Sequence, residues 1–105
     1  MIQSVKVVGN KATVILSGET EGAVGYDYVI STDKDCINNK DYDKVNRNIL
    51  NTTTDFTYVG QDVYYAYCHA WKRGEDGKKI FSDWSNAYPF VVSAITPSQP
   101  AITSV

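Results

Sequence analysis

Two neighbouring residues, Cys68 and His69, have the side-chain types of a nucleophile and its general base. They lie in the run from Asp62 to Arg73, which is rich in aromatic and small residues and is expected to be a strand. Adjacent side chains of a strand point to opposite faces of its sheet, so the imidazole cannot reach the thiol. Cys68 is therefore expected to be a small core residue and not a nucleophile.

The thiols of Cys36 and Cys68 could also form a disulfide. Antiparallel pairing of this run with the strand expected near Tyr26 would put Tyr26 near Trp71. The same pairing would put Cys36 near Asp62, which leaves Cys68 about 20 Å away at about 3.3 Å per residue. A disulfide requires Cα atoms within about 7 Å, so we expect two free thiols.

A polar segment further along the chain carries several possible oxygen ligands for a metal ion. They are Asp33, Asp35, Asn38, Asp41 and Asp43. The segment has the composition of a calcium loop, but it lacks the turn glycine and the bidentate glutamate of the EF-hand pattern. We expect a solvated turn that holds no metal.

Composition and charge exclude several classes of function. With one histidine, no plausible triad and no Gly-rich phosphate loop, the sequence predicts neither an enzyme nor a cofactor. A net charge of −2 without a basic stripe argues against a nucleic-acid partner. No apolar run approaches the roughly 18 residues of a membrane span, and the N-terminus lacks the regions of a signal peptide. The chain is therefore expected to be cytosolic or a piece of a longer secreted protein.

The alternate residues of the run from Asp62 to Arg73 form the most promising binding surface. They are Tyr65, Tyr67, His69 and Trp71, referred to below as the aromatic row. Exposed aromatic faces on a rigid sheet can stack on sugar rings or anchor a protein partner. The alternative is that a neighbouring strand covers the row and that its members only stabilise the sheet, by about 0.2 to 1 kcal/mol for each cross-strand pair.

The chain of 105 residues has the size of one domain, and its eight tyrosines together with many Val, Thr and Ile residues favour strands. Seven strands are expected, over residues 4–8, 12–17, 26–31, 42–48, 53–59, 62–73 and 80–92. The fourth is expected at a sheet edge, and the last is expected to be interrupted near Trp84 and at Pro89. Two sets should face the core, Tyr64, Ala66, Cys68 and Ala70 on one strand and Tyr26, Tyr28 and Ile30 on another. This pattern predicts an all-β fold, a seven-stranded Greek-key sandwich.

Two parts of the chain carry a family resemblance. The run from Tyr64 to Trp71, the Gly-containing loop after it and the segment from Phe81 to Asn86 resemble the last two strands of fibronectin type III domains. The residues from Gly25 to Asp33 look like the third strand of bacterial members of that family. The resemblance covers about residues 3 to 93 and implies an immunoglobulin-like sandwich.

The resemblance also implies roles for individual residues. Tyr64, four residues after Gly60, matches the tyrosine corner, whose hydroxyl bends back to the loop before the strand. Many members place a tryptophan on the second strand, which this chain lacks. We expect Leu16 to replace it, with Tyr26 or Trp84 filling the lost volume.

Two loop motifs carry weaker hypotheses. In the loop from Lys72 to Asp76, the run Arg73-Gly74-Glu75 stands where some such modules carry the integrin motif Arg-Gly-Asp. Glutamate is one methylene longer than aspartate, so we expect no integrin binding. Asn51 begins a glycosylation acceptor sequence, which matters only in a host that glycosylates.

The sequence changes character after residue 93. Residues 1–93 are expected to form the domain, and residues 94–105 a linker rich in Pro, Ser and Thr. The last residues echo the first, since Ile102, Ser104 and Val105 match Ile2, Ser4 and Val5. This match favours the start of a following repeat, and coincidence in a disordered tail is the alternative.

Together these features predict a non-catalytic spacer or interaction module of a larger extracellular or cell-surface protein, bacterial and built of tandem repeats. The expected partners are neighbouring domains of the same chain, and a protein or glycan if the aromatic row binds; the module itself is expected to be monomeric, without membrane insertion. The alternative is a carbohydrate-binding accessory domain of a secreted polysaccharide-degrading enzyme, which the aromatic row would serve.

Overall fold

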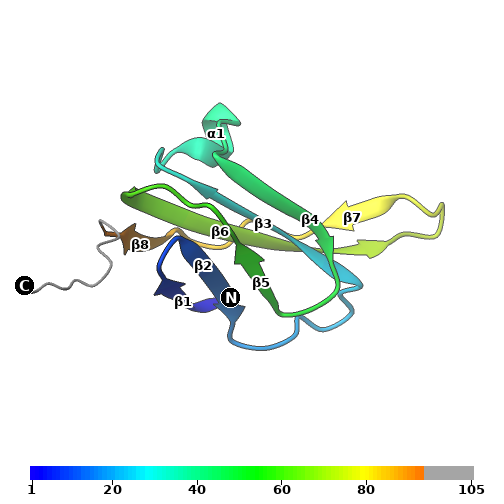
Figure 1. The fold of residues 1–105 in the computed structure, drawn as a ribbon. Helices are drawn as coiled ribbons and strands as arrows, with labels where there is room; N and C mark the ends of the chain where they lie inside the picture. The colour runs from blue at the N-terminus through cyan, green and yellow to red at the C-terminus, as the bar shows by residue number, and fades with distance from the viewer. Residues whose placement is uncertain (94–105) are drawn as a thin grey trace, which may run out of the picture.

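A computed structural model of the protein describes residues 1–93, which form eight strands and one short helix (Figure 1). The elements are β1 (Ile2–Val8), β2 (Lys11–Leu16), β3 (Gly25–Ser31), α1 (Cys36–Asn39), β4 (Lys44–Ile49), β5 (Thr53–Phe56), β6 (Asp62–Arg73), β7 (Lys79–Phe81) and β8 (Tyr88–Val92). The expected all-β architecture is confirmed. The expected number of seven strands is wrong, because the last one is divided into β7 and β8.

The strands form two antiparallel sheets. The order is β1-β2-β5 in one sheet and β4-β3-β6-β7 in the other, where β8 also pairs with β6. A single cluster of buried side chains from both sheets lies between them. The hairpin of β6 and β7 extends beyond the three-stranded sheet, on the right of Figure 1.

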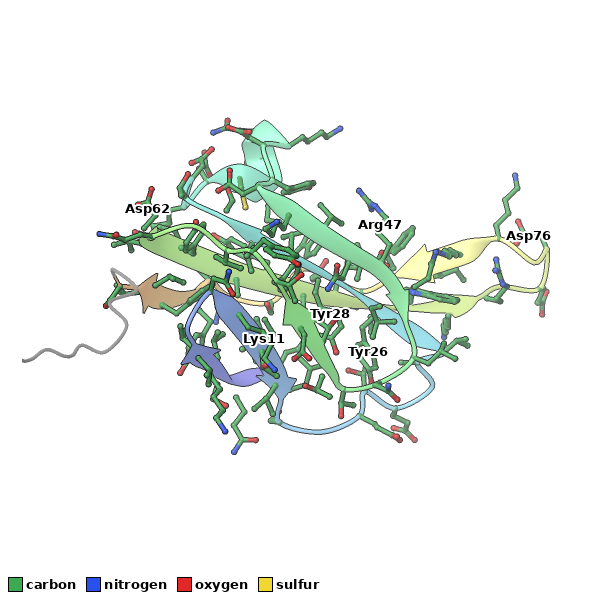
Figure 2. All side chains as sticks on the ribbon, viewed as in Figure 1. Lys11, Tyr26, Tyr28, Arg47, Asp62 and Asp76 are labelled. Atoms are coloured by element: carbon green, nitrogen blue, oxygen red, sulfur yellow. The ribbon has the colours of Figure 1, made fainter. Side chains whose placement is uncertain are left out.

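The inner face of β6 is the centre of this core, as expected from its alternating pattern. Its four inward residues are buried, namely Tyr64, Ala66, Cys68 and Ala70. They pack with Tyr26 and Tyr28 of β3, which lie in the interior in Figure 2. The Tyr28 hydroxyl reaches the rim of the core, where it donates to the backbone oxygen of Asn51 at 2.8 Å. Burial raises the pKa of the Tyr28 phenol.

Two of the three residues proposed to replace the missing tryptophan lie in the core. Leu16 and Tyr26 are both buried there. Trp84 is not, because the chain between β7 and β8 runs beside β6 and turns the Trp84 side chain to the outer face of the sheet, where it stacks on His69. The proposal that Trp84 fills core volume is therefore wrong.

The register of β3 against β6 differs by one residue from the expected pairing. Trp71 lies opposite Gly25, and Tyr26 lies opposite Ala70. Residues directly opposite each other share a face, and a slip of one residue would move an inward side chain to the outer face. Since Tyr26 and Ala70 both face the core, the expected pairing, which is one residue off, is incompatible with the burial pattern.

Serine side chains continue the pairing where the regular strand stops between β7 and β8. The Ser82 and Ser85 backbone N–H groups donate to Ala70 and Cys68, at 2.9 and 2.8 Å. Their hydroxyls in turn accept from the N–H groups of the same two residues, at 2.9 and 3.0 Å. The interruption expected near Trp84 is therefore a stretch in which side chains replace part of the ladder.

The position of β4 agrees with the prediction from the sequence, and the length of β5 differs from it. β4 lies at a sheet edge, as expected. β5 ends at Phe56 and not at Val59, because Tyr58 has a left-handed backbone (φ 56°) that does not fit a strand. No helix within residues 1–93 is long and apolar enough to cross a membrane.

Candidate functional site

The aromatic row is only partly exposed. His69 and Trp71 retain 8% and 6% of their accessible surface, and Tyr65 and Tyr67 are half-buried. The hypothesis of an exposed row is therefore wrong for its last two members, because segments that follow β6 in the chain fold over them.

His69 is held on three sides. A hydrogen bond of 2.8 Å joins its Nε2 to Asp27 Oδ2 on β3. Its ring stacks between Trp84 and Phe81, with centroid distances of 3.7 and 4.8 Å. The imidazole thus fixes the segment after β6 to the sheet, with little surface left for a ligand.

Asp27 is the residue that the sequence analysis missed. It is buried directly opposite His69, and its second carboxylate oxygen accepts the backbone N–H of Asn48 on β4 at 2.9 Å. Asn48 has a left-handed backbone (φ 59°), which turns this N–H toward the carboxylate. Asp27 therefore ties β4 and β6 to β3, with both carboxylate oxygens engaged in bonds within the domain.

Trp71 is closely packed by its neighbours. A Cβ added to Gly25 would stand 2.8 Å from the ring. Lys79 Nζ lies 4.3 Å from the ring centroid, in a cation–π geometry, and the Arg73 guanidinium lies 5.5 Å from the same centroid. Trp71 Nε1 is buried without a hydrogen-bond partner within residues 1–93. A sugar ring cannot stack on a tryptophan packed in this way.

The other half of the row is partly covered by the segment that contains α1. The Tyr67 hydroxyl donates to the backbone oxygen of Lys34, just before α1. Cys36 on α1 is fully buried, and burial followed by the charge of Asp33 raises the pKa of its thiol. This segment closes over one part of the row, as Trp84 and Phe81 close over the other.

Neither thiol lies in an environment that would make it reactive. Cys36 and Cys68 are both free and buried. Burial raises the pKa of the Cys68 thiol to about 12, with a smaller effect of the Asp27 charge in the same direction. Since the thiolate is the reactive form, both groups are inert at neutral pH.

The acidic segment uses its side chains to build its own turn. Asp33 accepts bonds from the Asn39 amide and the Asp35 N–H, which together hold the pKa of Asp33 below its usual range. Asp43 accepts the Thr32 N–H at 2.7 Å. Within residues 1–93 no group of three or more His, Cys, Asp or Glu side chains is arranged to hold a metal ion.

The remaining residues singled out in the sequence lie in separate places. The Tyr64 hydroxyl donates to the Gly60 carbonyl at 2.7 Å, the backward bond expected of a tyrosine corner. Asn51 is exposed in the connection between β4 and β5, and Gly74 lies in the β6–β7 hairpin loop. The structure does not bring these residues together with the aromatic row into one site.

Comparison of the chain with protein-family models, with curated proteins and with solved structures finds no match. A function must therefore be inferred from the geometry together with the sequence resemblance around β6. Within residues 1–93 the most exposed large apolar side chain is Tyr58, at 82%, in the loop between β5 and β6.

Proposed function

We propose that this chain is a non-catalytic spacer and interaction module, a Greek-key sandwich of the fibronectin type III kind. The two-sheet architecture supports the proposal, as do the backward bond of Tyr64 and the sequence resemblance around β6. We place it in tandem repeats of a larger extracellular or cell-surface protein, bacterial in type. Its partners are the neighbouring domains of that chain.

The observation that carries this proposal is the position of the two chain ends. The Met1 backbone oxygen accepts the Ser17 N–H at 2.9 Å, which places Met1 beside the connection from β2 to β3. Val92 pairs with Asp62 at the start of β6, beside the connection from β5 to β6. The β1–β2 turn at Asn10 belongs to this second end, because Asn10 accepts the Val59 N–H at 2.8 Å. The chain therefore enters at one end of the sandwich and leaves at the other, as a spacer requires.

The hydrogen bonds of the polar side chains also support a structural role. Asp27, His69 and Asp33 are the ones that could have formed a site, and each is bonded to its own domain. A reaction needs groups that are free to contact a substrate, and these are not free.

The carbohydrate-binding alternative has no observation in its favour. It required open aromatic faces, whereas the two most buried members of the row are covered by Gly25, Lys79, Phe81 and Trp84. Replacing Tyr67 and Trp71 by Ala is expected to lower stability without changing signal on a glycan array. A glycan signal that the two replacements abolish would restore the alternative.

A distance measurement between the two ends tests the spacer directly. Nitroxides are attached at Gln3→Cys and Val91→Cys, two exposed positions near the entry and the exit. The buried native thiols should not be labelled, and the unsubstituted protein provides that control. A spacer gives one narrow distance distribution, no wider than that of a reference pair at Gln3 and Leu50. A broad or two-peaked distribution would contradict the proposal.

A further inference from the structure

We propose that the two ends of this module bind each other head to tail, with Tyr58 of one copy seated in a hollow at the entry end of the next. The inference rests on the proposed function, because it names the partner of a tandem module as a second copy of the same domain. It is carried by a protruding aromatic side chain at one end and an apolar hollow of matching size at the other.

Tyr58 is held out of the protein by its neighbours. The next residue, Val59, is buried in the core, and its N–H is bonded to Asn10. Tyr58 itself has φ 56° and is 82% exposed. Bulky residues rarely adopt this left-handed conformation, and where they do it often marks a functional position. The chain thus uses an unfavourable backbone to present a large aromatic ring to solvent.

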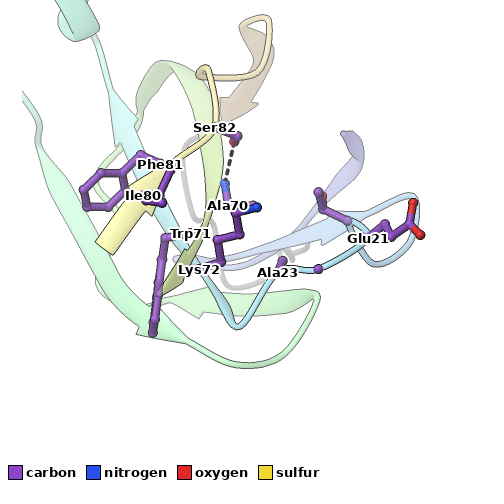
Figure 3. Close-up of a pocket in the computed structure, with 10 residues that line it drawn as sticks. Glu21, Ala23, Ala70, Trp71, Lys72, Ile80, Phe81 and Ser82 are labelled. Atoms are coloured by element: carbon purple, nitrogen blue, oxygen red, sulfur yellow. Dashed lines mark hydrogen bonds between the residues drawn. The ribbon is translucent and has the colours of Figure 1, made fainter. Parts of the chain in front are cut away.

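The hollow lies at the opposite end, between the β2–β3 connection and the β6–β7 hairpin (Figure 3). It has a volume of about 180 Å³. Its lining is mainly apolar and includes Ala23, Ala70, Trp71, Ile80 and Phe81. An apolar cavity of about 150 Å³ admits a benzene molecule, so this hollow is large enough for the ring of a tyrosine. Glu21 also lines it, with its carboxylate directed away from Ala70 and Trp71 in Figure 3.

The positions of the chain ends fit this pairing. Met1 lies against Ser17, in the same connection that forms one wall of the hollow. The exit at Val92 lies at the end that carries Tyr58, as the pairing of Val92 with Asp62 shows. Seating Tyr58 of one copy in the hollow of the next therefore brings the exit of the first copy to the entry of the second. A contact between two different surfaces does not close a two-fold dimer, and because the two surfaces lie at opposite ends of the sandwich it extends into open chains.

The charges of the two ends disfavour contact between two Tyr58 ends. The segment of residues 33–43 belongs to the Tyr58 end, since Ser31 before it pairs with Tyr65 near the start of β6. This segment has four aspartates against two lysines, so two copies of it repel each other. At the hollow end the four basic residues of the hairpin segment 72–79 are balanced by its two acidic residues together with Glu19 and Glu21. A negative end facing a balanced end favours the head-to-tail orientation over contact of two Tyr58 ends, and the effect is screened by salt.

Sedimentation of the full chain and two variants tests the inference. Tyr58→Asn removes the ring and keeps a residue that tolerates a left-handed backbone. Ile80→Glu puts a charge into the hollow at a side chain that is 50% exposed, so folding should be preserved. In a tandem protein a short linker would hold neighbouring copies at an effective concentration in the millimolar range. Separate wild-type chains are therefore expected to associate at millimolar concentration, and the size of the assemblies should keep growing as the concentration rises.

Each variant alone is expected to associate at least about tenfold more weakly than the wild type. An equimolar mixture of the two should form a dimer that does not grow, because the intact hollow of one variant can accept the Tyr58 of the other. A monomeric wild type at millimolar concentration, or a mixture that remains monomeric, would overturn the inference.

Two matched controls sharpen the test. Tyr58→Phe keeps the ring and should keep the association. Leu50→Glu adds the same charge as Ile80→Glu at a side chain that is 71% exposed and does not line the hollow, so association should persist. Loss of association in either control would overturn the assignment of the contact. None of these outcomes affects the nitroxide distance within one copy, so the spacer proposal is tested separately.

Discussion

The outer face of β6 and the loop before β6 make opposite use of aromatic side chains. On β6, His69 and Trp71 stand in a row that looks like a binding surface, yet other parts of the chain cover both. In the loop, nothing in the sequence around Tyr58 indicates a binding surface, yet Tyr58 is the most exposed large apolar residue of residues 1–93. The difference shows that residue type does not decide whether an aromatic surface is available for binding. The path of the neighbouring chain decides it.

The cover over β6 has a definite cause. The serines after β7 keep the chain paired with β6, and this path carries Trp84 and Phe81 across the imidazole of His69. Tyr58 has no such cover, because its left-handed backbone turns it away from the core that holds Val59. Of the four predictions below, two concern the covered region, one the junction and one the open region.

The largest effect is expected for Asp27→Ala. The substitution leaves the buried His69 ring nitrogen and the Asn48 N–H without these partners, which should lower the free energy of unfolding by about 3 kcal/mol. Urea denaturation measures the loss. Asp27→Asn keeps an oxygen for the Asn48 N–H and should lose less. A loss below about 0.5 kcal/mol for Asp27→Ala would mean that the bond between Asp27 and His69 does not hold Phe81 and Trp84 over β6.

The next effect is expected for Gly25→Ala. The added Cβ would stand 2.8 Å from the Trp71 ring, so the ring or the strand must shift, at a cost of about 2 kcal/mol. Gly18→Ala is the matched control, because an added Cβ there meets nothing within 4 Å. Thermal unfolding should show a clear fall in melting temperature for the first variant and little change for the second. Equal behaviour of the two would contradict the packing of Trp71 described above.

Much of the fold could be predicted from the sequence, and the reason is visible in β6. Its inward residues alternate strictly and are small after Tyr64, so their burial follows from the period of a strand. The Asp27–His69 pair could also have been found. The inward residues of β3 and β6 have even numbers, and residues opposite each other share a face, so an even-numbered residue of β3 must lie opposite an even-numbered residue of β6. When Tyr26 is placed opposite Ala70, the next residue, Asp27, lies opposite His69.

Other features could not be predicted from local patterns. The position of Trp84 depends on the serine bonds that direct the chain after β7, and nothing in the sequence period reveals them. The exposure of Tyr58 depends on a left-handed backbone, which a tyrosine rarely adopts. The echo of the N-terminus at residues 101–105 lies outside the described residues and stays a prediction.

A smaller loss is expected for Tyr64→Phe, which acts on neither region but on the junction between them. It removes the bond to Gly60 and should lower the free energy of unfolding by about 1 kcal/mol. Because Gly60 lies two residues after Tyr58, hydrogen exchange should also show faster opening of this loop. Unchanged stability and exchange would show that the bond contributes nothing to the shape of the loop.

The smallest effect, and the only gain, is expected for Tyr58→Asn. A side chain that tolerates the left-handed backbone should raise the free energy of unfolding by about 0.5 kcal/mol, as measured in urea. If Tyr58 serves binding, a replacement can make the folded protein more stable, whereas replacing a residue that serves packing lowers stability. A loss of stability in this variant would place Tyr58 with the covered aromatic residues.

The most direct test of the account is a dilution series of the isotope-labelled chain, followed by backbone amide NMR from millimolar to micromolar concentration. The account predicts that signals shift at the two ends of the sandwich, around Tyr58 and Asn10 at one end and around Ala23, Trp71 and Ile80 at the other, while those of Tyr65, Tyr67 and His69 stay fixed. Shifts confined to the aromatic row, or no shifts at all, would contradict it.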